Sequence, residues 1–179
     1  MSIATPSIDA LRDTLPDELK DIRLNLSSVL AGENLQPLQS MGVALAAAAF
    51  VRCRPLVEAI EADLRAADAA AAAPVISDAI AAAGLMAMNT VYYRFRHMLG
   101  KETYEARPPR LRMSRMAQPA TSKADFELMS LGCAALAGCE LCIKNHEASL
   151  VHLSVSEDAC HDAVRIAAVI NAVACGLPV

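Results

Sequence analysis

The segment from Gly138 to Glu147 holds the residue types best suited to redox chemistry. It reads GCELCIKNHE, with two cysteines three positions apart and a histidine four positions after the second. On a helix, Cys142 and His146 share one face about a turn apart, and Cys139 lies on that face too. A thiolate is the reactive form of cysteine, and a nearby histidine can accept the thiol proton. A second thiol within reach closes a disulfide once the first is oxidised. The segment predicts a dithiol redox centre.

Zinc binding is an alternative interpretation of the same residues. Cys139, Cys142 and His146 could supply three ligands, and Cys160 or His161 a fourth, in a helical module without enzymatic activity. Against it, the chain has no second CxxC pair and no closely spaced pair of histidines. A purely structural pair of buried cysteines is a third interpretation.

The residues around the dithiol predict how it is positioned. Gly138 should end one helix, so that Cys139 starts the next and Cys142 falls in its first turn. Unpaired backbone N–H groups and the helix dipole favour a thiolate at that place. The local sequence therefore favours a reactive dithiol at the start of a helix.

A carboxylate on the preceding helix is the expected partner of the histidine. Residues 122–125, Ser-Lys-Ala-Asp, resemble a capping box that opens this helix. Glu127 shares one helical stripe with Gly138, at the end that leads into the dithiol. We therefore expect Glu127 to orient and charge-balance His146, as an acidic partner orients a catalytic histidine.

The composition predicts an all-α protein. The chain has 179 residues, of which 55% are hydrophobic and 20% charged, and much of the apolar content is alanine, the best helix former. Its length suits one domain over residues 1–179. So apolar a composition is consistent with buried subunit interfaces.

Periodicity and capping residues divide the chain into helices. We expect Pro74 to break the alanine tract and Ser77 to cap a long helix through Phe95. We expect an ordered loop over about residues 100–121, with several prolines and arginines, inside the domain. The expected helices cover residues 7–30 with an interruption at Pro16, 35–52, 55–67, 77–95, 122–138, 139–153 and 156–175.

A weak internal echo suggests a duplicated helical hairpin. Residues 53–61 align with residues 139–147, with identical residues at Cys53 and Cys139. The positions of Cys142 and His146 are occupied by Leu56 and Ile60 in the first copy, so only the second copy would be active. Chance similarity between apolar segments is the alternative.

Charge and segment lengths exclude several function classes. A net charge of −4 disfavours nucleic-acid binding, which is typical of basic domains. Residues 1–6 lack the basic and apolar regions of a signal peptide. The apolar runs 41–51 and 69–76 are shorter than the roughly 18 residues a membrane-spanning helix needs. We expect a cytoplasmic protein without a membrane segment, whose cysteines are free, catalytic or metal-binding.

The other candidate residues have simpler interpretations. We expect the four remaining cysteines to be small apolar core residues and the three remaining histidines to lie at the surface or at helix ends. The loop arginines should form a solvated segment, or alternatively a docking patch for an acidic partner. These residues are Cys53, Cys133, Cys160, Cys175, His97, His152, His161, Arg107, Arg110, Arg112 and Arg115.

The chain resembles the AhpD family of alkyl hydroperoxidases, within the carboxymuconolactone-decarboxylase-like superfamily. The resemblance spans nearly the whole chain and is carried by segments 20–28, 86–94, 111–113, 123–128 and 139–147. The CxxCxxxHE pattern, preceded at this distance by a Phe-Glu pair, is its most specific part.

The resemblance implies an all-helical homotrimer with a thiol peroxidase activity. Such proteins reduce organic hydroperoxides and regenerate the peroxiredoxin AhpC. Their electrons come from dihydrolipoamide on a lipoylated acyltransferase subunit of a 2-oxoacid dehydrogenase, and no bound cofactor or metal is implied. A decarboxylase of the same superfamily is a further alternative, but it would leave the dithiol without a purpose.

The family's proton relay carries over as Glu127, His146, Cys142 and Cys139. The histidine spacing and the family pattern favour Cys142 as the peroxidatic thiol and Cys139 as the resolving one, although in many CxxC proteins the first cysteine is the nucleophile. Leu141 stands where some members have a histidine. That histidine's role is therefore absent here, which implies a simpler or slower relay.

Overall fold

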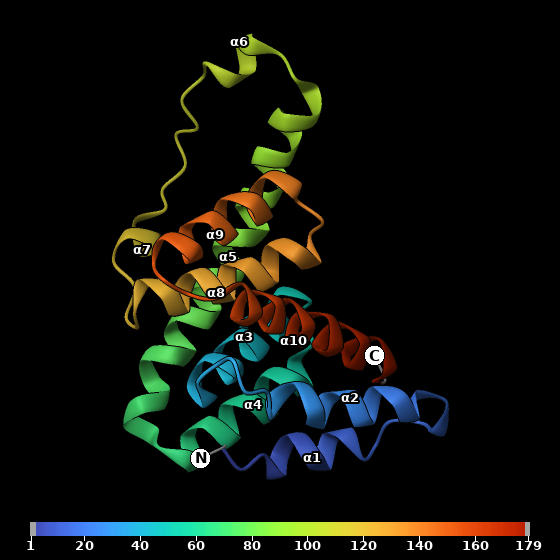
Figure 1. The fold of residues 1–179 in the computed structure, drawn as a ribbon. Helices are drawn as coiled ribbons and strands as arrows, with labels where there is room; N and C mark the ends of the chain where they lie inside the picture. The colour runs from blue at the N-terminus through green and yellow to red at the C-terminus, as the bar shows by residue number, and fades with distance from the viewer. Residues whose placement is uncertain (1–2, 178–179) are drawn as a thin grey trace.

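The structure, a computed structural model, is built from helices throughout the described residues 3–177, which confirms the all-α fold (Figure 1). The ends of the expected 1–179 domain, residues 1–2 and 178–179, lie outside the described part. The elements are α1 (Pro6–Arg12), η1 (Asp17–Leu19), α2 (Lys20–Leu30), α3 (Pro37–Phe50), α4 (Arg54–Ala67), α5 (Ala69–Leu99), α6 (Glu102–Glu105), α7 (Ser114–Ala117), α8 (Lys123–Leu136), α9 (Glu140–His152) and α10 (Glu157–Gly176).

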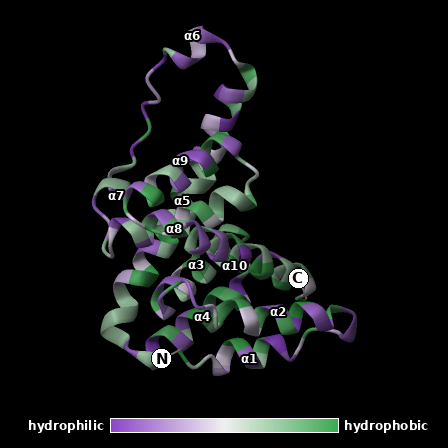
Figure 2. Cartoon of the chain, viewed as in Figure 1, coloured by the Kyte–Doolittle hydropathy of each residue, from purple (hydrophilic) through white to green (hydrophobic). Residues whose placement is uncertain are grey.

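Helix α3 lies at the centre of the bundle. It carries an unbroken run of buried residues from Ser40 to Ala48 and packs against α5, α8, α10 and α4. Small side chains let neighbouring helices approach closely; Gly132 of α8, for example, lies against Val43 and Ala167. Figure 2 shows hydrophobic residues concentrated in this bundle, whereas the segment around α6, which projects from it, is largely hydrophilic.

Two helical hairpins repeat the same backbone pattern, as the sequence echo suggests. Helices α3 and α8 have 14 residues each, and each is followed by a helix of similar length, α4 or α9. Gln39 and Asp125, 86 positions apart, occupy the same place in the two hairpins, and Gln39 donates a hydrogen bond to Asp125. Both helices begin with a capping box.

The turn that ends the first helix of each hairpin is also repeated. Arg52 and Gly138 both adopt the left-handed conformation, with φ of 60° and 62°. The N–H group of the following cysteine then bonds back to the carbonyl of Ala48 or Ala134, which closes a Schellman motif. Cys53 and Cys139 thereby become the N-caps of α4 and α9.

Pro74 does not break its helix, contrary to the sequence prediction. Helix α5 runs for 31 residues through Pro74, and its N-cap is Asp68, whose side chain accepts the N–H groups of Ala70 and Ala71. The missing N–H of Pro74 would have bonded the carbonyl of Ala70, which is exposed near the helix start and can be hydrated. Alanine propensity and packing against α3 offset the remaining cost.

By length and composition alone, α5 and α10 could span a membrane. The sequence prediction that no segment is long enough is therefore wrong by this measure for both helices. Helix α5 is longer than predicted because it continues through Pro74. Both helices pack within the bundle, α5 against α3 and α8, and α10 against α8, α3 and α2. They are core helices of this fold.

The segment between α5 and α8 is a crossover that projects from the bundle and returns along it (Figure 1). It contains the short helices α6 and α7 within the predicted loop. The C-terminal part of this crossover is held against α5 by the fully buried Asp78, which accepts hydrogen bonds from Arg115, Ala120 and Thr121. Arg115 is thus a structural ion-pair partner, whereas Arg107, Arg110 and Arg112 are exposed.

Candidate active site

The two cysteines of the motif lie at the start of α9 and form a disulfide in this structure. Cys139 is the N-cap, and its sulfur accepts a hydrogen bond from the backbone N–H of Cys142, 3.4 Å away. Cys142 lies in the first turn. The Gly138 turn therefore places the dithiol at the positive end of a helix dipole, which favours a thiolate after reduction.

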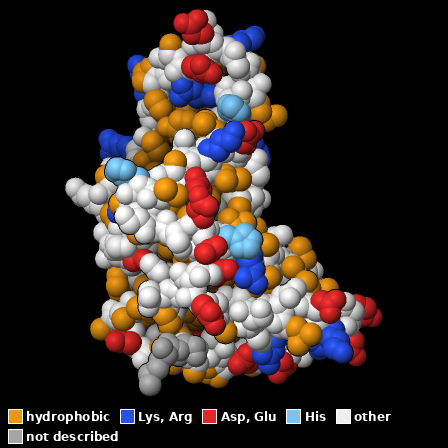
Figure 3. All heavy atoms as spheres, in the orientation of Figure 1, with side chains coloured by type: hydrophobic (Ala, Val, Ile, Leu, Met, Phe, Trp, Pro, Cys, Tyr) orange, Lys and Arg blue, Asp and Glu red, His pale blue; other side chains and the backbone are white. Residues whose placement is uncertain are grey.

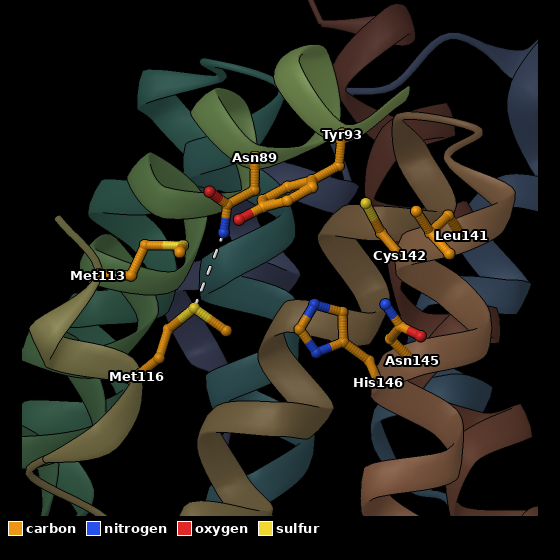
Figure 4. Close-up of a pocket in the computed structure, with 8 residues that line it drawn as sticks. All are labelled: Asn89, Tyr93, Met113, Met116, Leu141, Cys142, Asn145 and His146. Atoms are coloured by element: carbon orange, nitrogen blue, oxygen red, sulfur yellow. Dashed lines mark hydrogen bonds between the residues drawn. The ribbon is translucent and has the colours of Figure 1, made fainter. Parts of the chain in front are cut away.

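Only one of the two sulfurs borders a cavity. Cys139 is 0% exposed, whereas Cys142 is 6% exposed and lines a half-open, mainly apolar cavity of about 230 Å³ (Figure 4). A substrate in this cavity can reach Cys142 without reaching Cys139. The cavity is lined by Asn89, Tyr93, Met113, Met116, Leu141, Cys142, Asn145 and His146.

His146 and Glu127 form a buried pair beside the cavity. Nδ1 of His146 lies 2.5 Å from Oε2 of Glu127, and the two residues are 7% and 4% exposed. Because a carboxylate only accepts, Nδ1 carries the proton, and Nε2 of a neutral ring is left as an acceptor. His146 lies one helical turn after Cys142, and both residues border the cavity. The arrangement can take a proton from the thiol and return it.

Lys123 joins this pair, and sequence reasoning gave it no role. Its ammonium group lies 2.7 Å from Oε1 of Glu127 and donates to the backbone carbonyl of Met116 at 2.8 Å. It thus connects the carboxylate with the crossover wall of the cavity. The i,i+4 spacing of Lys123 and Glu127 on α8 could have indicated this ion pair from the sequence. Such pairs are common on exposed helix faces, so the spacing alone does not point to a functional site.

Glu127 stays ionised despite its burial. Burial alone would raise the pKa of this carboxyl, but the hydrogen bonds and charges of His146 and Lys123 outweigh burial and lower the pKa below its usual value. A permanent negative charge therefore lies behind the histidine ring, where it holds Nδ1–H in place.

The wall of the cavity opposite α9 comes from segments that the motif does not reveal. Asn89 and Tyr93 lie on α5, and Met113 and Met116 belong to the crossover. No spacing rule relates these positions to the dithiol, because only tertiary packing brings α5 and the crossover beside α9. The resemblance covered residues 86–94 and 111–113 without assigning them a role.

The predicted zinc alternative finds no support. Between residues 3 and 177 no group of three or more His, Cys, Asp or Glu side chains is arranged to hold a metal ion. Cys139 and Cys142 are joined to each other, and a disulfide offers no thiolate ligand. The proposed fourth ligands, Cys160 and His161, lie in the first turns of α10 outside this cluster.

The remaining cysteines and histidines differ in burial. Cys133 and Cys160 are buried, as expected, and burial raises the pKa of the Cys133 thiol to about 12. Cys53 is half-buried, and Cys175 is exposed near the end of α10, so the expectation of a core position is wrong for Cys175. The other three histidines are exposed: His97, His152 and His161.

Comparison with known proteins points to one family. Residues 103–174 match the Carboxymuconolactone decarboxylase family. Over 96% of its length the chain is 53% identical to "Alkyl hydroperoxide reductase AhpD" of Anaeromyxobacter dehalogenans (strain 2CP-C), covering 90% of that protein. It is 47% identical over 94% of its length to the protein of the same name from Rhodopseudomonas palustris (strain BisB18), covering 91% of it. Rhodospirillum centenum (strain ATCC 51521 / SW) has another such protein, 46% identical over 94% of the chain and covered over 89% of its own length. The chain therefore belongs to the AhpD family of alkyl hydroperoxide reductases.

Proposed function

We propose that the protein reduces organic hydroperoxides with Cys142 as the peroxidatic thiol and Cys139 as the resolving thiol. The observation that carries the proposal is the meeting of Cys142 and the His146–Glu127 pair at one cavity. The burial of Cys139 supports this order of the two thiols, because a substrate in the cavity meets the sulfur of Cys142 first. The names of the relatives support peroxide reduction as the reaction class.

The proposed oxidative half-reaction uses the relay for proton transfer. His146 accepts the thiol proton of Cys142 through Nε2 while Glu127 stabilises the ring. The thiolate attacks the terminal peroxide oxygen, so that an S–O bond forms and the O–O bond breaks. The alkoxide leaves and takes the proton from His146. Cys139 then displaces water from the sulfenic acid, which closes the disulfide.

The proposed reductive half-reaction uses a dithiol as electron donor. One thiol of dihydrolipoamide attacks the Cys139–Cys142 disulfide, and its second thiol completes the exchange. This returns two protein thiols and releases the cyclic disulfide of lipoamide. We propose the lipoylated acyltransferase subunit of a 2-oxoacid dehydrogenase as the carrier of this group. In the cell, the reduced dithiol would also regenerate the peroxiredoxin AhpC by the same exchange chemistry.

Leu141 simplifies the proposed relay. It lines the cavity where some family members have a histidine, so no second imidazole stands beside Cys142 in this chain. Proton transfer then depends on His146 alone. The side chain also makes this wall of the cavity apolar.

We also propose a cytoplasmic homotrimer. The crossover and the end of α5 expose large apolar side chains. Figure 3 shows hydrophobic side chains among charged ones on the projecting part of the molecule. Burial of this surface between copies of the chain would explain its composition. These side chains are Val91, Phe95, Met98 and Tyr104. A sedimentation mass of one chain at micromolar concentration would contradict the trimer.

Steady-state assays of two serine variants test the two-thiol mechanism. With dihydrolipoamide and cumene hydroperoxide, Cys142→Ser should lose turnover, and Cys139→Ser should stop after forming a sulfenic acid that dimedone traps on Cys142. Cys175→Ser, which changes an exposed thiol near the end of α10 that does not line the cavity, is the matched control and should keep full activity. Full turnover of either motif variant, or a dimedone adduct on Cys139 in the Cys142→Ser variant, would refute the assignment.

A further inference from the structure

Asn89 is a buried amide without a strong hydrogen bond. It is 5% exposed, and its Oδ1 has no hydrogen-bond partner among the described residues. Its Nδ2 donates only to the thioether sulfur of Met116, at 3.7 Å. Sulfur is a weak acceptor, and native proteins rarely bury amides that are so poorly paired. The side chain is thus available to a better partner that enters the cavity.

The amide lies across the cavity from the reactive sulfur. Asn89 lies on α5, and Figure 4 shows it on the opposite side of the cavity from Cys142. In the same view its Nδ2 points toward Met116, within the cavity wall. A ligand oxygen placed between the two walls could replace the sulfur as the acceptor of this N–H group.

We propose that Asn89 binds the hydroperoxide opposite Cys142 and donates a hydrogen bond to its leaving oxygen. This inference rests on the proposed peroxidase function. Attack on an O–O bond runs in line, so the leaving oxygen lies on the side away from the sulfur. The thiolate's electron pair forms the S–O bond, and the pair of the breaking O–O bond becomes negative charge on that leaving oxygen. The Asn89 N–H group on the opposite wall stabilises this charge until the proton arrives.

The cavity also indicates which hydroperoxides fit. Its remaining wall is formed largely by Met113, Met116 and Leu141, and its volume of about 230 Å³ lies below the roughly 300 Å³ at which sites for drug-sized ligands begin. Methionine side chains adapt to irregular apolar groups. The site therefore suits a compact, apolar organic hydroperoxide, with its peroxide end held between Asn89 and Cys142.

Two variants separate the amide from the shape of the cavity. Asn89→Leu keeps the branching of the side chain and removes both polar atoms. Asn171→Leu is the matched control, since it makes the same change at an exposed position of α10 that does not line the cavity. Asn89→Ala serves as a second variant if the leucine does not fold. The measured quantities are kcat/KM for tert-butyl hydroperoxide and the rate at which iodoacetamide alkylates reduced Cys142.

The proposal predicts that loss of the Asn89 amide lowers peroxidase activity without changing the reactivity of the Cys142 thiol. Asn89→Leu should lower kcat/KM for the hydroperoxide by about 10- to 100-fold, while Asn171→Leu changes it less than about 3-fold. Alkylation of Cys142 should keep its wild-type rate, because the thiolate itself is unaffected. Wild-type kcat/KM in both Asn89 variants would overturn the role of Asn89, as would a parallel fall in alkylation. A wild-type protein that reduces no hydroperoxide would instead refute the proposed function.

Discussion

The sharpest test of the relay is the change Glu127→Gln. Gln has nearly the same shape as Glu, so the fold should persist while the negative charge behind His146 disappears. The contact is short, at 2.5 Å, and both groups are buried. Hydrogen bonds to charged groups contribute about 1.5–3 kcal/mol net, which corresponds to about 10- to 150-fold in rate if the relay limits turnover. Because Lys123 already neutralises part of this charge, we expect the lower half of that range.

The assay is peroxidase turnover with dihydrolipoamide and cumene hydroperoxide at neutral pH. His146→Phe should cost at least as much as Glu127→Gln, and the double variant should be little worse than the worse single variant, because the two residues act as one unit. Glu61→Gln is the matched control, since Glu61 also forms an i,i+4 ion pair, with Arg65, but contacts no histidine. Additive losses in the double variant would refute the reasoning, as would unchanged activity of Glu127→Gln.

Three further predictions concern charge and backbone. Lys123→Met should move the acid limb of the kcat/KM profile to higher pH by about half a unit or more, since loss of the cation favours a protonated relay. Lys123→Arg keeps the cation and should leave the limb close to its wild-type position, and an unmoved limb in Lys123→Met would contradict the coupling. Asp78→Asn should lower the free energy of unfolding in urea by about 3 kcal/mol at neutral pH. Burial alone would raise the pKa of Asp78, but its hydrogen bonds outweigh burial and lower it. The stabilisation is therefore fully present above the ordinary pKa of an aspartate and is lost as the pH falls through the lower pKa of Asp78 in the folded state, so the variant should show a flatter acid limb in its melting temperature. Arg52→Gly should stabilise the fold by up to about 1 kcal/mol in the same urea assay, because glycine adopts the left-handed conformation that Arg52 now occupies at a cost; a lower stability would show that the Arg52 side chain matters more than its backbone.

Local sequence was sufficient to predict the helices around the dithiol. Gly138 marks a left-handed turn, the capping box at Ser122 opens α8, and Ser156 caps α10. These signals act over a few residues, which is why they could be read without the fold. The prediction at Pro74 was wrong because hydration of a carbonyl near the helix start and packing against α3, which local sequence does not reveal, keep α5 continuous.

The sequence by itself determined the all-α class and the Cys-Cys-His segment, because both are encoded by periodicity, capping or spacing along the chain. It left the repeated hairpin open between duplication and chance similarity, and the matching helices and turns of the structure showed the repeat. Only the tertiary structure decided which sulfur borders a cavity and which groups surround it. Asn89 comes from α5 and Met116 from the crossover, and Lys123 joins that crossover to Glu127. These contacts depend on how segments far apart in the chain pack together. They could not be predicted from helical spacing, because spacing relates only neighbours on the same helix. The burial of Cys139 beside the accessible Cys142 likewise follows from how α8 and α5 cover the start of α9.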